Sequence, residues 1–148
     1  MLKKFQMQYC KPVGTPIVTG CKLSKIDDSE NVEQKIYISI IGNLLYVTTT
    51  RPDVMNVVCQ VAQFQSSPKD SHFLAVKRIL RYLKGTTDYG LWYPKGNNLD
   101  LYAFTDADWA SCVDVWKSTS GATFYLGECL VSWSSKNQST ISFSTTIS

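Results

Sequence analysis

Two aspartates, Asp106 and Asp108, follow a run of alternating apolar and polar residues that begins at Leu99. Alternation with a period of two is typical of a β-strand, so we expect Asp106 to lie at the far end of a strand. A carboxylate on such a rigid element suits a hard cation such as Mg²⁺, which requires oxygen ligands in close octahedral geometry. The alternative is that both aspartates only cap the turn after the strand.

A second group of candidate residues is cationic. Lys77, Arg81 and Lys84 recur at steps of four and three, with Arg78 beside them, which places them along one side of a helix. We name these four residues the basic ridge. Such a ridge can follow the phosphates of a nucleic acid, with binding that weakens as salt is added. The alternative is a solvated helix face without a ligand, and for His72 we expect a surface or capping role rather than catalysis.

The elements that must position these residues begin with helices. Residues 1–31 contain Pro, Gly and a cluster of acidic residues, and predict an extended, mobile arm with a short helix over 2–9. Pro52 is expected to break the chain and restart it. The last helix is predicted to have Ser67 as its cap, Pro68 in its first turn and Gly85 as its stop. Apolar residues at helical spacing predict three helices in all, over residues 32–47, 54–62 and 67–85.

After Gly85 the period changes from helical to alternating. Four strands are predicted, over residues 89–93, 99–105, 119–126 and 129–134. The last two form a hairpin across Gly127, and the last three form an antiparallel meander. The predicted fold class is therefore α+β, with a helical segment followed by a three-stranded sheet. We place the divisions of the chain at an arm over 1–31, a helical region over 32–86 and a sheet region over 87–148.

Charge and cysteine usage narrow the class of protein. Residues 1–98 carry 13 Lys or Arg against 7 Asp or Glu, whereas residues 99–148 carry 2 against 5. This division suits a first part that holds a polyanion and a second part that gathers carboxylates around a metal. The five cysteines show neither zinc spacing nor a disulfide pattern, and no secretory signal or membrane segment is recognisable. We therefore expect an intracellular protein, cytoplasmic or nuclear, whose oligomeric state is open.

Five segments of the sequence carry a resemblance to a known family. They occupy residues 46–53, 75–86, 101–110, 117–121 and 131–136. The last three segments are similar to the ribonuclease H domain at the end of the polyprotein of copia-type long-terminal-repeat retrotransposons. The first two are similar to the connection between reverse transcriptase and ribonuclease H in the same polyproteins, particularly those of plants.

The resemblance implies a reaction and a substrate. Ribonuclease H enzymes cut the RNA strand of an RNA–DNA hybrid with two Mg²⁺ ions held by carboxylates. By the resemblance, Asp106 takes the place of the first metal-binding aspartate. Asp108 belongs to the same motif, and we expect it to face away from the metal and to have a lesser role.

The sequence also departs from the family. The second family carboxylate is a glutamate that should follow Ser144, Thr145 and Thr146, but this position is Ile147 and the chain ends one residue later. We therefore expect a truncated and degenerate copy with an incomplete ribonuclease H-like fold. Such a copy would be catalytically inactive, hold Mg²⁺ weakly and retain some nucleic-acid binding. The alternatives are a fragment of an active ribonuclease H and a reused remnant that acts as an interaction or effector protein.

Overall fold

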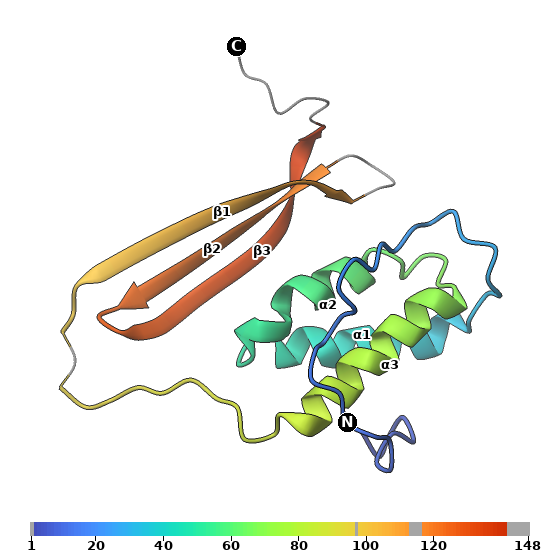
Figure 1. Ribbon diagram of the computed structural model, residues 1–148, viewed down its shortest axis with the longest axis horizontal. Helices are drawn as coiled ribbons and strands as arrows, with labels where there is room; N and C mark the ends of the chain where they lie inside the picture. The colour runs from blue at the N-terminus through green and yellow to red at the C-terminus, as the bar shows by residue number, and fades with distance from the viewer. Residues whose placement is uncertain (1, 97, 113–116, 142–148) are drawn as a thin grey trace. The chain divides into compact units, whose positions relative to one another are not determined.

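The computed structural model of the chain describes residues 2–96, 98–112 and 117–141. Helices occupy the first part of the chain and strands the second (Figure 1). The chain divides into two compact units, Met1–Tyr89 and Gly90–Ser148. We call them the helical unit and the sheet unit. Three α-helices and one three-stranded antiparallel sheet confirm the α+β class.

Each predicted helix is present in the helical unit. The elements are α1 (Gln34–Val47), the short 3-10 helix η1 (Pro52–Val54), α2 (Met55–Ala62) and α3 (Asp70–Gly85). Pro52 stands at the first position of η1, where its missing N–H costs nothing. Among the described residues no helix is both long and apolar enough to span a bilayer, α3 having 16 residues.

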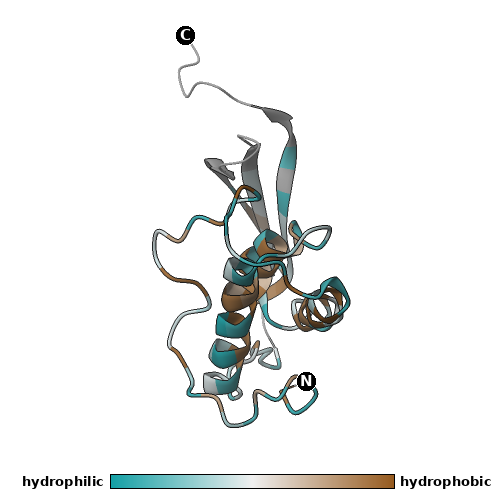
Figure 2. Ribbon diagram, turned by 90° about the vertical axis from the view of Figure 1, so that its right-hand side faces the viewer, coloured by the Kyte–Doolittle hydropathy of each residue, from teal (hydrophilic) through white to brown (hydrophobic). Residues whose placement is uncertain are grey.

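One apolar core joins the three helices. Its largest fully buried side chains include Tyr37, Ile40 and Leu44 of α1 and Ile79 and Leu80 of α3. In Figure 2 the helices carry both apolar and polar residues, as expected of amphipathic helices. The Tyr37 hydroxyl donates a 2.7 Å hydrogen bond to a backbone carbonyl of α2, and burial raises the pKa of this phenol.

The start of α3 differs from the prediction. The helix begins at Asp70 with Lys69 as its N-cap, so Ser67 is not the cap and Pro68 lies before the first turn. His72 takes the capping role instead, because its Nδ1 atom accepts the Lys69 backbone N–H at 3.0 Å. Pro68 lies in the loop before α3. This loop is hydrogen-bonded to the arm where it meets the helix, because the N–H of Asp70 donates to the carbonyl of Glu30 at 2.9 Å.

The arm is neither helical at its start nor separate from the core. Residues 2–9 form turns, with the Met7 N–H donating to the Leu2 carbonyl at 2.9 Å. Gln6 has a positive φ of 57°, a backbone conformation that is uncommon outside glycine. The expectation of a mobile arm is therefore wrong, because apolar arm residues pack against the helical core, namely Leu2, Phe5, Met7, Val13, Ile17 and Leu23.

The sheet unit is an antiparallel meander of β1 (Leu101–Cys112), β2 (Lys117–Leu126) and β3 (Cys129–Ile141) in the order β1-β2-β3. The three-stranded meander and the hairpin are confirmed. Gly127 has a φ of 59°, which suits the first central residue of a two-residue hairpin turn. The predicted strand over 89–93 does not form, and β1 runs well past residue 105.

Candidate functional site

The basic ridge lies along α3 as its spacing predicted. Lys77, Arg78, Arg81 and Lys84 are all half-buried, so their stems contact the protein while their charged groups reach polar atoms. None of the four forms an ion pair with a carboxylate of the described residues. The charge of the ridge is therefore not neutralised by a direct ion pair, although Asp27 and Asp28 line a surface hollow together with Arg78 and Arg81.

Two ridge arginines bind the arm rather than pointing freely into water. The Arg78 guanidinium donates to the carbonyl of Thr15 at 3.1 Å and to its hydroxyl at 2.8 Å. The Arg81 Nε atom donates to the carbonyl of Lys11 at 2.7 Å. Since a carbonyl or hydroxyl oxygen carries no net charge, these hydrogen bonds hold the arm without neutralising the arginines.

Lys84 and Gly85 complete this attachment at the end of α3. The Lys84 ammonium donates to the carbonyls of Gln8 and Cys10, both at 2.7 Å. A Cβ atom at Gly85 would lie 3.0 Å from the Cβ of Pro12, so glycine leaves the space that the arm occupies. The arm thus crosses α3 on three ridge side chains.

Lys77 differs from the other three ridge residues. Its ammonium lies 4.3 Å from the centroid of the Phe73 ring, within the range of a cation–π contact. No arm carbonyl is among its hydrogen-bond partners in the described part of the chain. A substitution of Lys77 therefore tests phosphate binding by the ridge without removing the hydrogen bonds that hold the arm.

Arg51 joins the two strings of residues that resemble the connection. Its guanidinium donates to both carboxylate oxygens of Asp53, at 2.9 and 2.7 Å, and to the carbonyl of Thr86 at 2.9 Å. The Tyr82 hydroxyl donates to Asp53 at 2.8 Å. The hydrogen bond from Arg51 lowers the pKa of Asp53. We name Arg51, Asp53, Tyr82 and Thr86 the arginine clamp, and it ties η1 to the end of α3.

The sequence alone missed the clamp. The sequence predicts only a chain break at Pro52, although the arginine before it and the aspartate after it can form a bidentate pair. The partner Thr86 is 35 residues away from Arg51 along the chain, so its contribution could not be read from local spacing.

His72 is buried, which corrects the expectation of a surface residue and confirms the capping role. Because its Nδ1 atom accepts the Lys69 N–H, its Nε2 atom carries the proton and donates to the carbonyl of Ser24 at 2.8 Å. The ring also stacks on Phe64 with centroids 3.8 Å apart. Both ring nitrogens are used in holding the arm and the start of α3.

Asp106 lies inside β1 and not at its end. It is exposed and is paired across the sheet with Gly121, while Asp108 pairs with Thr119 further along the same strand. No break in β1 separates the two positions. Residues 144–147, where the family glutamate was sought, lie outside the described residues, as does the side chain of Asp108.

The described residues do not provide a set of ligands for Mg²⁺. Among them no group of three or more His, Cys, Asp or Glu side chains gathers closely enough to hold a metal ion. A single carboxylate does not offset the dehydration of magnesium. We therefore derive no catalytic step through a metal at Asp106.

Comparisons with known proteins place the chain in a family. It is 43% identical over 93% of its length to the retrovirus-related Pol polyprotein from transposon RE2 of Arabidopsis thaliana, and 39% identical over 99% of its length to that from transposon TNT 1-94 of Nicotiana tabacum. It spans only 10% and 11% of these relatives. It is also 42% identical to secreted RxLR effector protein 161 of Plasmopara viticola, over 74% of this chain and 78% of that protein.

No family model matches the chain, and no solved structure matches it either. A ribonuclease H-like fold therefore stays a prediction for the sheet unit. The two Pol matches cover nearly the whole chain, and so extend over both the helical unit and the sheet unit. This chain belongs to the retrovirus-related Pol polyproteins of plant transposons.

Proposed function

We propose that this chain is a reverse transcriptase connection joined to part of a ribonuclease H domain, and that it holds RNA–DNA hybrid or another nucleic acid without cutting it. The basic ridge carries this proposal. Its four cations lie on one side of α3 with no carboxylate partner, and a phosphate backbone would supply the missing negative charge.

The arm already occupies part of the basic ridge to which a phosphate would bind. Arg78, Arg81 and Lys84 already donate to arm oxygens, so a phosphate must either share these donors or displace the arm. An arginine has five N–H donors and a lysine three, so sharing is chemically feasible. Lys77 needs no such rearrangement and should make the first phosphate contact.

The carboxylates of the described residues are too few for us to expect cutting. Two-metal hydrolysis needs several oxygen ligands around each ion, and the described residues place Asp106 in the middle of a strand without such a group nearby. Only Mg²⁺-dependent cleavage that is lost in Asp106→Asn would contradict this part of the proposal. Labelled RNA–DNA hybrid, purified protein and the variant in the same buffer provide that test.

Binding is tested with Lys77→Ala, because this change leaves the arm contacts in place. We expect weaker binding to labelled hybrid and a smaller dependence of affinity on salt. The matched control is Lys95→Ala, which removes an exposed lysine outside the helical unit. Limited proteolysis checks that the arm stays attached in both variants. Equal affinities for the two variants would refute the ridge as the binding site.

A second candidate function is favoured by one relative. The effector from Plasmopara viticola is covered over 78% of its length, far more than either Pol polyprotein. A Pol-derived segment that acts through protein contacts is therefore the alternative. Folded protein that binds neither hybrid, duplex nor single strands at low salt would favour this alternative over nucleic-acid binding.

A further inference from the structure

A groove in the helical unit lies apart from the arm contacts of the ridge. It has a volume of about 590 Å³ and is formed by the start of the arm, α1 and α3. This volume is within the range of about 300–1,000 Å³ that is usual for ligand pockets. Its floor is apolar and consists of Phe5, Met7, Ile36, Ile40, Phe73 and Leu80.

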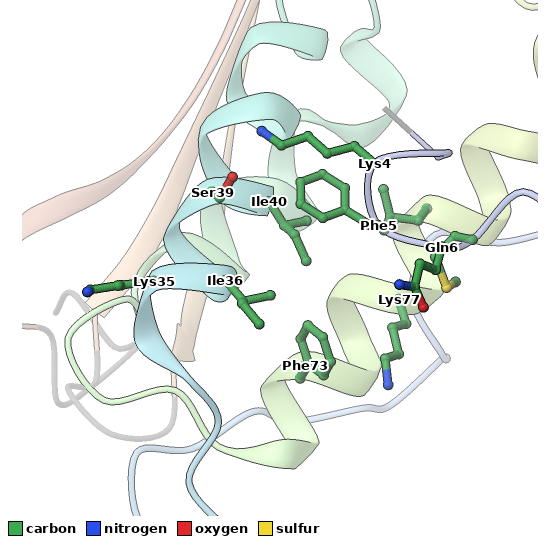
Figure 3. A pocket seen from close by; sticks show the side chains of 11 residues that line it. Lys4, Phe5, Gln6, Lys35, Ile36, Ser39, Ile40, Phe73 and Lys77 are labelled. Carbon is green, nitrogen blue, oxygen red and sulfur yellow. The ribbon is translucent and has the colours of Figure 1, made fainter.

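Three lysines border this floor, one from each segment. Lys4 comes from the arm, Lys35 from α1 and Lys77 from α3. Figure 3 shows Phe5, Ile36, Ile40 and Phe73 gathered toward the centre, with the lysines around them. The remaining lining residues, Gln6 and Ser39, are uncharged, so no carboxylate among the lining side chains balances the three ammonium groups.

The groove is open to a partner. Ile36 lines the floor and is 43% exposed, so part of the apolar floor is accessible to a partner. The arm holds its side of the groove in a constrained turn, because Gln6 has a positive φ. A surface that is apolar, concave and rimmed by one sign of charge has the features of a recognition site.

We propose that this groove binds a short acidic segment of a partner protein, with one or two large apolar side chains on the floor and carboxylates beside the lysines. Charge complementarity selects the acidic flanks, since three cations meet no anion in the groove. The aliphatic side chains of Ile36, Ile40 and Leu80 favour an apolar side chain over a nucleobase. Both phenylalanine rings are already contacted by lysine ammonium groups, at 5.3 Å for Lys4 over Phe5 and 4.3 Å for Lys77 over Phe73.

The probe is a short fluorescein-labelled peptide in which leucine and phenylalanine are flanked by glutamates, titrated with the full chain and followed by fluorescence anisotropy. Its control peptide carries glutamine in place of each glutamate. We expect Lys35→Glu to weaken binding of the acidic peptide by about tenfold or more, because it places like charges side by side. Lys22→Glu makes the same change of charge outside the groove and should leave the affinity unchanged.

A second variant tests the floor without changing charge. Ile36→Ser should weaken peptide binding while leaving binding to RNA–DNA hybrid unaffected, so this proposal and the proposed function can fail separately. Circular dichroism checks that each variant is folded. The proposal is overturned if the peptide does not bind, if the glutamine control peptide binds as tightly as the acidic one, or if Ile36→Ser instead abolishes self-association of the chain.

Discussion

The helical unit has an apolar core, although some of its large apolar side chains, such as Tyr46 and Leu74, lie exposed on its surface; the described side chains of the sheet unit form no such core. Ile41, Leu44, Val58 and Leu80 have no exposed surface, and their helices share one core. In the sheet unit, by contrast, Leu101 is 68% exposed and Phe104 is 62% exposed. Among the residues of 90–141 whose side chains are described (which leaves out 97, 107–118, 137 and 139–141), Cys129 alone is buried. A sheet is stable when one face is covered, so the helical unit should carry most of the stability of the chain.

The positions of the tryptophans allow this difference to be measured. Trp92, Trp109, Trp116 and Trp133 all lie beyond residue 89. Tryptophan fluorescence therefore reports on the sheet unit, and helical circular dichroism reports on the helical unit. Because the core lies within the helical unit alone, its unfolding transition should not coincide with that of the sheet unit.

The largest expected effect is that of Leu80→Ala. Leu80 is fully buried between the helices, and truncating such a leucine destabilises a core by about 2–5 kcal/mol. We expect the transition seen by circular dichroism in urea to move to much lower denaturant while the tryptophan transition stays in place. A matched shift of both transitions would show that the two units unfold as one.

Replacing His72 should have the next largest effect. His72→Ala leaves the Lys69 N–H and the Ser24 carbonyl without their partner and removes the stacking on Phe64. Loss of buried hydrogen bonds and an aromatic contact costs about 2–3 kcal/mol. Because both bonds hold the arm and the start of α3, limited proteolysis should cut the arm faster than in the wild type. An unchanged rate of cutting would mean that the ridge alone holds the arm.

The helical elements and the meander could be predicted because each depends on local periodicity. The spacing of Ile36, Ile40 and Leu44 indicates α1, and alternation around Gly127 indicates the hairpin. The arm could not be placed, since its attachment depends on hydrogen bonds from Arg81 and Lys84 to backbone carbonyls that are 70 and 76 residues away along the chain. Backbone acceptors have no sequence signature. The same residues that predicted a ligand-binding ridge therefore turned out to bind the chain itself.

The strand predictions show a second limit. Alternation over 89–93 was read as a strand, but no neighbouring strand pairs with this segment in the described structure. Pairing is a tertiary property, whereas alternation is local. For the same reason Asp106 was placed at a strand end, although β2 continues to pair with β1 beyond it.

The arginine clamp predicts a pH dependence that is confined to the helical unit. The pKa of Asp53 lies below its ordinary value of 3.8, chiefly because Arg51 donates to the carboxylate. Its contribution to stability is therefore complete above that pH and is lost as the pH falls through 3.8 toward the lower value in the folded state. Asp53→Asn should cost about 1–2 kcal/mol at neutral pH and reduce the acid-induced loss measured by circular dichroism. A variant with the wild-type acid dependence would exclude Asp53 as its source.

The smallest expected effect belongs to the sheet unit. Gly127 adopts a φ of 59° in the β2–β3 turn, and an L-residue with a Cβ atom is strained in this region by about 1 kcal/mol. Gly127→Ala should therefore lower the tryptophan transition slightly and leave the circular dichroism transition unchanged, the reverse of Leu80→Ala. Gly14→Ala is the matched control, because a Cβ atom there meets nothing within 4 Å. If Gly127→Ala moved the circular dichroism transition, the stability of the helical unit would depend on the sheet unit. The helical unit would then not be stable by itself, contrary to the comparison made above.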